Sequence, residues 1–418
     1  MTDESKQRLA YVDWMRGLAC LLMFQTHCYD SWLSPAARQS KLFMWSQLVG
    51  TLPAPLFLFL AGVSFALVTN NLREKGMAPG EIARTTIRRG AEILGLALLF
   101  RVQEFLLGQP WPGALFGQIG APHGAPWTDL LRVDILNMMG LSMMLMGVVC
   151  RVAATRARSI AAACGVALGV AMLTPPVWTT WRVVTHRLPW PLESYLNGVH
   201  TFAEPQPWLF PIFPWTGLAF AGLAAGFALF SKKEEVHAKA PSAQRRAEAS
   251  QTQSATEAQR TQSQRQTAER ELRVLLWLGA VGVVLIALSW WLDALPVQLY
   301  AVYDYWHTGP NFFLIRVGIL LVILLGCYVW CRWGAGTWGF SPMIQLGQSS
   351  LVVYWVHIEF VYGRFSILPK RGMGVLGASL GLLGVFVAMV LLSLANARWK
   401  ARRKALASGA KAPGSHAG

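Results

Sequence analysis

The stretch NFFLIRVGILLVILLGCYVWC, residues 311–331, decides the fold class. It carries a single charge, Arg316, and a helix needs about 20 mostly apolar residues to cross a bilayer. Nine further segments have the same character, which predicts an all-α, polytopic membrane bundle of about ten helices. The expected segments are residues 14–33, 46–70, 90–108, 131–150, 159–177, 208–230, 274–294, 311–331, 343–363 and 373–395.

The composition agrees with a membrane protein, since 54% of the 418 residues are hydrophobic and only 14% are charged. Soluble domains carry about a quarter charged residues. If the N-terminus lies inside, 26 of the 37 Lys and Arg residues also fall inside, as the positive-inside rule requires when both termini are cytoplasmic. The net charge of +16 therefore records orientation in an inner (cytoplasmic) membrane, and a nucleic-acid partner loses its support.

One polar segment divides the chain. Val236 is the only large aliphatic residue between Ser231 and Glu271, so this segment cannot bury a core. We expect six helices over residues 1–230, a cytoplasmic linker over 231–272 that is disordered or partly helical, four helices over 273–395, and a basic, disordered tail over 396–418. The six cysteines form no CxxC pattern, so neither a metal site nor a disulfide scaffold is expected.

Ionisable side chains inside lipid are costly and tend to mark function. At about 1.5 Å per residue, His27 lies about 20 Å along the first segment and His357 about 21 Å along the ninth. The two histidines are therefore expected at one level, in the outer half of the membrane, although a histidine satisfied by packing is the alternative for each. Other polar residues expected near this level are Glu104, Asp134, Asn137 and Arg316. Arg101 and Glu104 are expected to form a structural pair.

The first segment carries its own set of polar residues. His27 follows Arg16 by eleven positions, which is three helical turns plus about 20°, so the two side chains share a face. Asp30 lies three residues further on and can reach the His27 ring. A carboxylate that orients a histidine is the usual partner of a general base. Arg16 is expected to hold a phosphate at the inner end, with an interfacial ion pair to Asp13 as the alternative.

These segments resemble a known family. VDWMRGLACLLMFQTH, residues 12–27, resembles the opening helix of integral-membrane acyltransferases of the acyltransferase 3-like superfamily, where an Arg precedes a His by ten intervening residues. PAPLFLFLAGVSFAL, residues 53–67, resembles the second helix of bacterial proteins similar to the heparan-α-glucosaminide N-acetyltransferase catalytic domain. The pieces VDILNMMGLSMML, FPIFPWTGLAFAGLAAG, GPNFFLIRVGILLVIL and GQSSLVVYWVHIEFVYG continue the resemblance in order, from about residue 8 to about residue 395.

The resemblance implies a membrane acyltransferase that takes an acyl group, typically acetyl, from cytoplasmic acyl-CoA. The acceptor is saccharide-like and lies on the outer side, with O- and N-acylation both open. The family's Arg-to-His motif falls on Arg16 and His27. Acyl-CoA acts as a co-substrate, so no permanently bound cofactor is implied. The chain departs from the eukaryotic heparan enzyme in one respect, since residues 28–45, after the first helix, contain no histidine.

The positions of the polar residues and the family resemblance together give the expected roles. The catalytic residues are His27, Asp30 and His357, the donor-binding residue is Arg16, and the substrate-binding residues are Asp134, Asn137, Arg316 and Tyr354. Direct transfer with His27 as base and covalent transfer through His27 are both open. The rival function is a proton-coupled transporter or flippase of a small polar solute or lipid-linked sugar, and a non-catalytic structural or sensory protein is a third. Membrane lipid surrounds the chain in each case, and a homodimer is left open.

Overall fold

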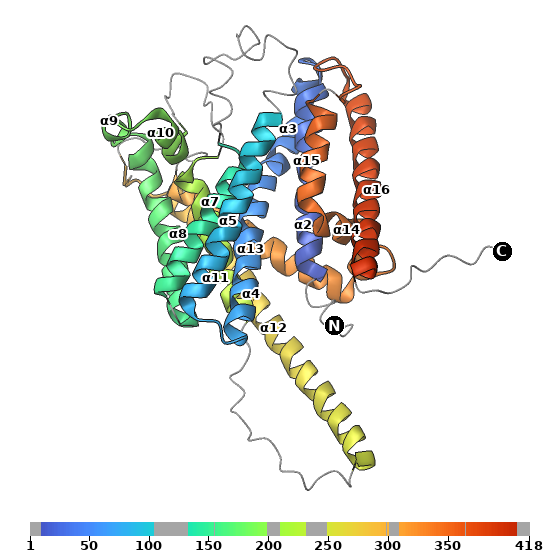
Figure 1. The fold of residues 1–418 in the computed structure, drawn as a ribbon. Coiled ribbons are helices and arrows are strands. Elements are labelled where there is room, and N and C mark those ends of the chain that lie inside the picture. Colours follow the sequence, from blue (N-terminus) through green and yellow to red (C-terminus); the bar gives the residue numbers. More distant parts are fainter. Residues whose placement is uncertain are drawn as a thin grey trace, which may run out of the picture.

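The computed structural model describes residues 10–103, 133–153, 155–198, 210–230, 249–297, 299–300, 309–363 and 365–407. Within these ranges the secondary structure is helical, and extended pairing is limited to one isolated bridge between Leu33 and Met373. The long helices run side by side in Figure 1. The predicted all-α bundle is therefore confirmed.

Two of the expected membrane segments, 46–70 and 343–363, contain parts of two helices each. In chain order the described helices are α2 (Ala10–Trp32), η1 (Ala37–Gln39), α3 (Lys41–Gly50), α4 (Pro53–Glu74), α5 (Pro79–Arg101), α7 (Ile135–Val152), α8 (Arg156–Trp178), α9 (Arg182–Thr185), α10 (Trp190–Asn197), α11 (Ile212–Leu229), α12 (Ala249–Asp293), α13 (Pro310–Trp333), η5 (Ala335–Thr337), α14 (Pro342–Gln348), α15 (Ser350–Val361) and α16 (Val375–Ala407).

Local sequence signals fix where several helices begin. Five helices, α4, α5, α10, α13 and α14, carry proline at the first or second position, where the missing N–H costs no hydrogen bond. α7 begins with a capping box, in which the Asp134 side chain accepts from the helix and the Asn137 side chain accepts from the Asp134 N–H. Such caps satisfy backbone groups that have no partner inside the helix.

Seven helical segments in the described part of the chain are long and apolar enough to cross a membrane. They are Lys41–Glu74, in which α3 and α4 are counted together, Ile135–Val152, Arg156–Trp178, Ile212–Leu229, Arg265–Asp293, Pro310–Trp333 and Val375–Arg403. α2, α5 and the α14–α15 pair occupy the other three expected segments without meeting that threshold. The chain is thus a multi-pass membrane protein, and the number ten stays a prediction.

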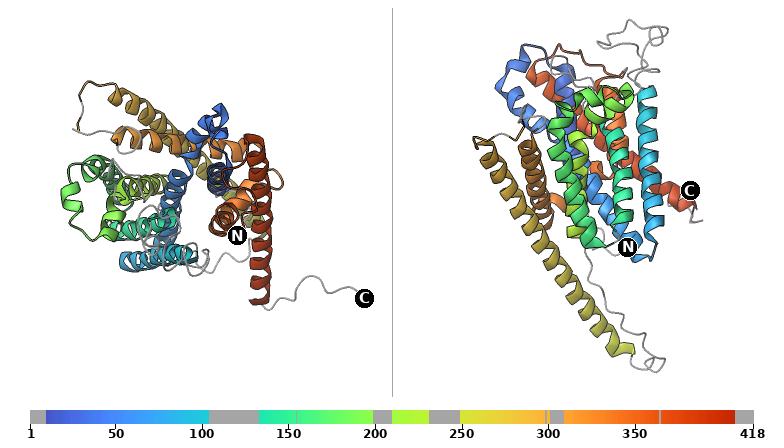
Figure 2. Two further views of the ribbon diagram at one scale, coloured as in Figure 1. Left: turned by 90° about the horizontal axis from the view of Figure 1, so that it is seen from above. Right: turned by 90° about the vertical axis from the view of Figure 1, so that its left-hand side faces the viewer.

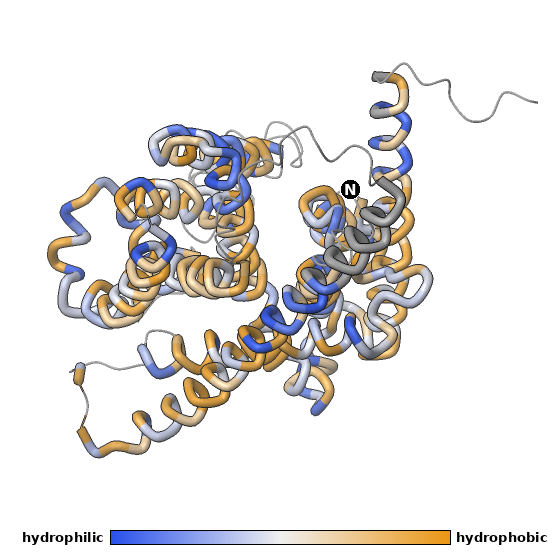
Figure 3. The backbone as a smooth tube through the Cα atoms, turned by 90° about the horizontal axis from the view of Figure 1, so that it is seen from below, coloured by the Kyte–Doolittle hydropathy of each residue, from blue (hydrophilic) through white to orange (hydrophobic). Residues whose placement is uncertain are grey.

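The surface of the bundle has the character expected in lipid. Large apolar side chains are exposed along its long helices, for example Trp277 at 74% and Leu376 at 75%. Seen from below, hydrophobic colour covers most of the helices, and hydrophilic colour gathers toward the beginning of α12 and the end of α16 (Figure 3). Monomeric soluble proteins rarely expose so much apolar surface, so these faces fit a lipid environment.

The helices form two groups that meet along α2, α4 and α13. α2, α14, α15 and α16 pack together, while α4, α5, α7, α8 and α11 form the larger group (Figures 1 and 2). The contact between α4 and α11 is so close that a Cβ added at Gly62 or Gly222 would lie 2.0 or 1.9 Å from a backbone oxygen of the other helix. Small residues permit this approach between membrane helices.

The beginning of α12 projects beyond the other helices at the end of the bundle where α2 begins and α16 ends (Figures 1 and 2). Because α12 begins at Ala249, the second part of the expected polar linker is helical and continuous with the seventh expected segment. α16 likewise continues to Ala407, so the first part of the expected tail is helical. Residues 231–248 and 408–418 lie outside the described residues.

Candidate active site

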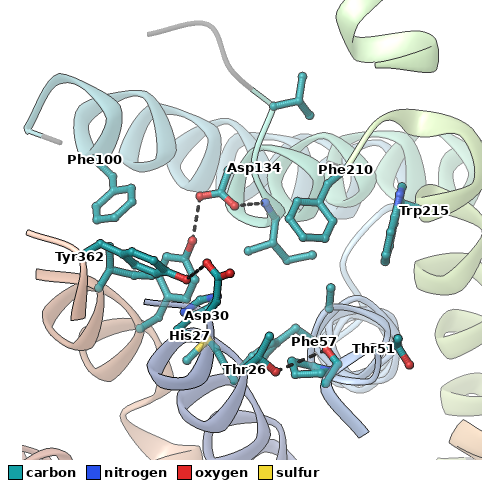
Figure 4. A pocket seen from close by; sticks show the side chains of 18 of the residues that line it. Thr26, His27, Asp30, Thr51, Phe57, Phe100, Asp134, Phe210, Trp215 and Tyr362 are labelled. Atoms are coloured by element: carbon teal, nitrogen blue, oxygen red, sulfur yellow. Dashed lines mark hydrogen bonds between the residues drawn. The ribbon is translucent and has the colours of Figure 1, made fainter. Parts of the chain in front are cut away.

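A cavity of about 670 Å³ lies at the end of the bundle where α2 ends and α4 begins. Its lining comes from the last three turns of α2, the last turn of α5, the first turns of α4, α7 and α11, the second turn of α13, and α15. Figure 4 shows aromatic rings on both sides, with Phe100 and Tyr362 facing Phe210 and Trp215 across the opening. We call this end of the bundle the cavity end, and the end where α2 begins the Arg16 end.

Five of the eight expected site residues line this cavity. They are His27, Asp30, Asp134, Arg316 and Tyr354. His357 lies directly behind His27 and is fully buried, and Asn137 is buried beside the cavity. Arg16 lies eleven residues before His27 on α2, at the other end of the bundle. Glu104 lies outside the described residues.

The two histidines form a hydrogen-bonded pair. His27 Nδ1 lies 2.8 Å from His357 Nε2, which confirms that the two residues share one level. Their ring planes differ by only 5°, and their centroids are 5.1 Å apart. That separation corresponds to the hydrogen bond plus the two ring radii, so the rings meet edge to edge in one plane and do not stack face to face. Such alignment suits a strong N–H···N bond.

The partners of His357 fix the protonation of both neutral rings. His357 Nδ1 lies 3.1 Å from the Val353 carbonyl oxygen, and a carbonyl can only accept, so Nδ1 carries the proton. His357 Nε2 is then an acceptor, and His27 Nδ1 must donate to it. His27 Nε2 is left with its lone pair. In the part of the chain that the structure describes, it has no hydrogen-bond partner, while the ring lines the cavity.

The partner expected for His27 was Asp30, and the structure gives a different one. Asp30 Oδ2 accepts from the Tyr362 hydroxyl at 3.0 Å, and Oδ1 lies 3.3 Å from Arg38 Nη2. Arg38 also donates to the Asp30 carbonyl oxygen. The Asp30 side chain is 57% exposed, so it turns outward to partners that remain partly in solvent. Asp30 therefore stands at the rim of the cavity, and His357 supports the His27 ring.

Asp134 is the centre of a second network. Its Oδ2 accepts from Arg101 Nη2 at 2.7 Å and from the Tyr354 hydroxyl at 2.7 Å. Its Oδ1 accepts from the backbone N–H of Ile135. The Arg101 and Asp134 side chains are only 7% and 13% exposed. The expected partner of Arg101, Glu104, lies outside the described residues. The α7 N-terminus brings Asp134 to Arg101, and this pair ties α5 to α7.

The side-chain oxygen and nitrogen of Asn137 both form hydrogen bonds within the protein. Its side-chain oxygen accepts from the Asp134 N–H, and Nδ2 donates to the Tyr195 hydroxyl at 3.0 Å. Burial raises the pKa of Tyr195, which lies in α10 outside the membrane segments, so this hydroxyl stays protonated. Asn137 therefore holds the start of α7 against α10, and its expected contact with substrate stays a prediction.

Arg316 is held by aromatic rings. Its guanidinium carbon lies 4.0 Å from the Phe312 ring centroid and 5.3 Å from the Trp215 ring centroid. Such contacts fix a cation without neutralising it. The Arg316 Nε atom is buried and lacks a hydrogen-bond partner among the described residues. A formal charge therefore remains available in the cavity wall.

Arg16 joins three helices at the opposite end. Nη1 lies 2.8 Å from Asp13 Oδ1, Nη2 lies 2.9 Å from Ser64 Oγ on α4, and the Gly347 carbonyl oxygen at the end of α14 is 3.5 Å away. The alternative of an ion pair with Asp13 is thus observed. The expected contact of Arg16 with the donor stays a prediction.

Sequence reasoning missed several residues at the cavity. Tyr362, Arg38, Phe312 and Trp215 contact the expected residues from segments distant in sequence or one turn away. Phe312 and Trp215 were present in two of the quoted pieces, and an arginine one turn after a phenylalanine is a spacing that can signal a stacked pair. Among the described residues no group of three or more His, Cys, Asp or Glu residues is placed to hold a metal ion.

The family described as heparan-alpha-glucosaminide N-acetyltransferase, catalytic, matches residues 8–259. That range covers more than half of the chain and includes the cavity residues from α2 through α11. No curated protein sequence matches the chain.

Proposed function

This chain belongs to the heparan-α-glucosaminide N-acetyltransferase catalytic family and is a membrane-embedded acyltransferase, and we propose that it transfers the acetyl group of acetyl-CoA to a saccharide acceptor within the cavity at the end of α2. The observation that carries the proposal is the unprotonated Nε2 of His27, which belongs to a ring that lines the cavity and is backed by His357. A histidine in this state is ready to remove a proton at neutral pH.

The transfer can be written with His27 as the base. The acceptor amine or hydroxyl attacks the thioester carbon, so that a new bond from nitrogen or oxygen to carbon forms. His27 Nε2 takes the acceptor's proton. The bond from carbon to sulfur then breaks, and the imidazolium returns the proton to the leaving CoA sulfur. His27 ends neutral, as it began, and a positioned base of this kind contributes about 10²–10⁴-fold to the rate.

His357 acts as a positioning residue. Its Nε2 accepts the His27 Nδ1 proton, which keeps Nε2 of His27 free. Its own Nδ1–H is tied to the Val353 carbonyl oxygen in α15. The pair therefore does for His27 what a carboxylate does in other histidine bases, without placing a negative charge beside it.

The surrounding charges support an imidazolium that forms during the reaction. Asp134 and Asp30 both line the cavity with His27, and a carboxylate near a histidine favours its charged form. Three helices, α4, α7 and α11, present their N-terminal turns to the cavity. Helix N-termini carry partial positive charge and free N–H groups, so they favour the oxyanion of the tetrahedral intermediate.

We place the acceptor and the donor on opposite sides of a cytoplasmic membrane. The cavity end is the end predicted to lie outside, and the Arg16 end is the one predicted to lie inside by the distribution of Lys and Arg. The acceptor then enters from outside, and acetyl-CoA, whose pantetheine arm is long and thin, reaches the cavity from the cytoplasm.

The experiment uses the full chain in proteoliposomes, with radiolabelled acetyl-CoA and glucosamine. Wild-type protein is expected to form acetylated sugar and free CoA in equal amounts. His27→Ala is expected to lose at least 100-fold in turnover while keeping its thermal unfolding temperature. His186→Gln is the matched control, because His186 lies in the turn after α9 beside Glu193, away from the cavity.

Two results would contradict the proposal. One is a His27→Ala protein that stays folded and acetylates at the wild-type rate. The other is movement of a sugar into the liposomes without any release of CoA, which would favour the transporter. The His357 assignment is tested by two variants. His357→Leu is expected to lose about tenfold because it leaves His27 Nδ1 without an acceptor. His357→Gln, whose amide oxygen can accept, should recover most of this loss.

A further inference from the structure

The last turns of α16 leave the bundle as an exposed helix. Ser393 and Asn396 still bond to the neighbouring helices, since Gln345 Nε2 donates to the Ser393 carbonyl oxygen at 3.1 Å and Asn396 Nδ2 donates to Ser349 Oγ at 3.3 Å. From residue 397 to residue 403 every side chain is exposed. The helix nevertheless continues to Ala407. We call residues 397–406 the α16 end, and the bundle does not cover it.

α16 is too long to stand upright in a membrane. Its 33 residues extend about 50 Å at about 1.5 Å per residue, whereas the hydrocarbon core of a bilayer is about 30 Å thick. α16 is inclined relative to α2, so its last turns leave the bundle sideways at the level where α2 begins (Figures 1 and 2). The α16 end therefore lies beside the bundle at the height of one membrane surface, the one predicted to be cytoplasmic.

The charges of the α16 end are all positive. Its exposed cations are Arg398, Lys400, Arg402 and Arg403. None of the four makes an ion pair within the part of the chain that the structure describes, and Glu359 is the last acidic residue of the sequence. The arginines of α5 differ, because Arg88 and Arg89 lie 3.3 and 3.0 Å from the Glu92 carboxylate. The positive charge of the α16 end is thus left for a partner outside the chain.

The α16 end also exposes large apolar side chains. Trp399 is 55% exposed and Leu406 is 72% exposed, and seven residues separate them, so they share one face of the helix. The Arg403 guanidinium carbon lies 4.9 Å from the centre of the Trp399 ring. Tryptophan is enriched where membrane meets water. Helices that lie in this interface combine Lys and Arg with Trp and Leu on the adjoining face.

We propose that the α16 end lies along the membrane surface and binds the phosphate groups of anionic phospholipids such as phosphatidylglycerol. Trp399 and Leu406 enter the boundary between headgroups and acyl chains, and the four cations contact the lipid phosphates. Anionic lipids of the cytoplasmic leaflet attract basic segments beside a membrane helix. An acidic protein would match the charge but would leave the apolar face in water. The proposal is independent of the acyl transfer, because no residue of the α16 end lines the cavity.

The experiment measures hydrogen exchange of the backbone amides of residues 397–406 by mass spectrometry. The full chain is placed in nanodiscs of phosphatidylcholine alone or of phosphatidylcholine with phosphatidylglycerol. Phosphatidylglycerol is expected to slow exchange about tenfold, because a helix held on a surface opens less often. High salt is expected to cancel this effect, because it screens exposed charges. A slowing that persists in high salt would overturn the proposal without recourse to any variant.

A triple variant tests the residues themselves. Arg398→Gln, Arg402→Gln and Arg403→Gln together are expected to remove the effect of phosphatidylglycerol. Glutamine favours a helix about as well as arginine, and equal exchange of variant and wild type in phosphatidylcholine shows that the helix is kept. The same three positions changed to lysine should keep the effect of the lipid in full.

The matched control removes the same number of exposed arginines from the predicted cytoplasmic side of α5. Arg84→Gln, Arg88→Gln and Arg89→Gln together are expected to leave the effect of phosphatidylglycerol unchanged. A loss of the effect in this control would assign it to net charge and overturn the proposal.

Three further results would contradict the proposal. One is equal exchange of the wild-type segment in the two kinds of nanodisc, and another is an effect of phosphatidylglycerol that survives the triple glutamine variant. The third is slower exchange on addition of acetyl-CoA in phosphatidylcholine alone, which would make the α16 end a contact for the phosphates of the donor.

Discussion

The two ends of the bundle carry similar residue types in different surroundings. At the Arg16 end, the guanidinium contacts Asp13, Ser64 and the Gly347 carbonyl, and the backbones of α2 and α14 touch. At the cavity end, His27 and Arg316 line a cavity of about 670 Å³. Among the described residues, His27 Nε2 and the buried Nε of Arg316 have no hydrogen-bond partner.

The difference shows how packing residues can be told from candidate functional residues. Both sets are polar and lie inside an apolar bundle, where such groups are costly. Where every donor and acceptor is matched by a neighbouring helix, the fold itself explains the residue. Where a rigidly held polar group at a cavity has no hydrogen-bond partner, the fold does not explain the residue. Binding of a substrate can explain it. The predictions below test this distinction at both ends.

The largest effect on stability is expected at the cavity end, from Asp134→Ala. Arg101 would be left as an uncompensated, buried charge, and breaking a buried pair in this way costs about 3–5 kcal/mol. The free energy of unfolding, measured by denaturation in mixed micelles, should fall accordingly. Asp30→Ala is the matched control, because its carboxylate lines the same cavity but is 57% exposed. Equal losses for the two variants would contradict the Asp134 network.

A smaller effect on stability is expected at the Arg16 end, from Gly17→Ala. The new Cβ would lie 1.9 Å from the Met343 carbonyl oxygen, so α2 and α14 must separate, at a cost of about 1–3 kcal/mol. Thermal unfolding of the purified protein measures this loss. Gly384→Ala in α16 is the control, since no heavy atom lies within 4 Å of its added Cβ. A Gly17→Ala protein as stable as Gly384→Ala would show that the two helices do not touch.

The smallest effect is expected at the rim of the cavity, from Arg38→Ala. The pair of Arg38 with Asp30 is 28% and 57% exposed, and exposed pairs contribute about 0.2–1 kcal/mol. The unfolding temperature should change by no more than a few degrees in low salt, and this small change should vanish in high salt. A loss as large as that of Asp134→Ala would make the rim part of the buried network.

Much of the fold and part of the site could be predicted from the sequence. Apolar segments of membrane length give the helices, and the rise per residue places His27 and His357 at one level, which their 2.8 Å contact confirms. Depth along a helix needs no knowledge of neighbours. Helix starts are also local, as the proline at α13 and the capping box at α7 show.

The partners of the polar residues could not be predicted, because they depend on which helices adjoin. Asp30 is close enough to His27 along α2, yet its carboxylate bonds to Tyr362, which lies 332 residues away in sequence. Arg101, at the end of α5, pairs with Asp134 at the start of α7. The spacing of residues gives the face of a helix, but the packing of the bundle decides what that face meets.

The most direct test of the account is the turnover of His27→Ala with and without added imidazole. At saturating acetyl-CoA and glucosamine, in proteoliposomes, the account predicts a fall of about 10²–10⁴-fold per folded molecule. It also predicts that imidazole, which fits the space left by the missing ring, restores part of this loss by supplying the base. Turnover of the folded variant within a factor of about two of wild type would show that the unpaired His27 nitrogen does not take part in the chemistry.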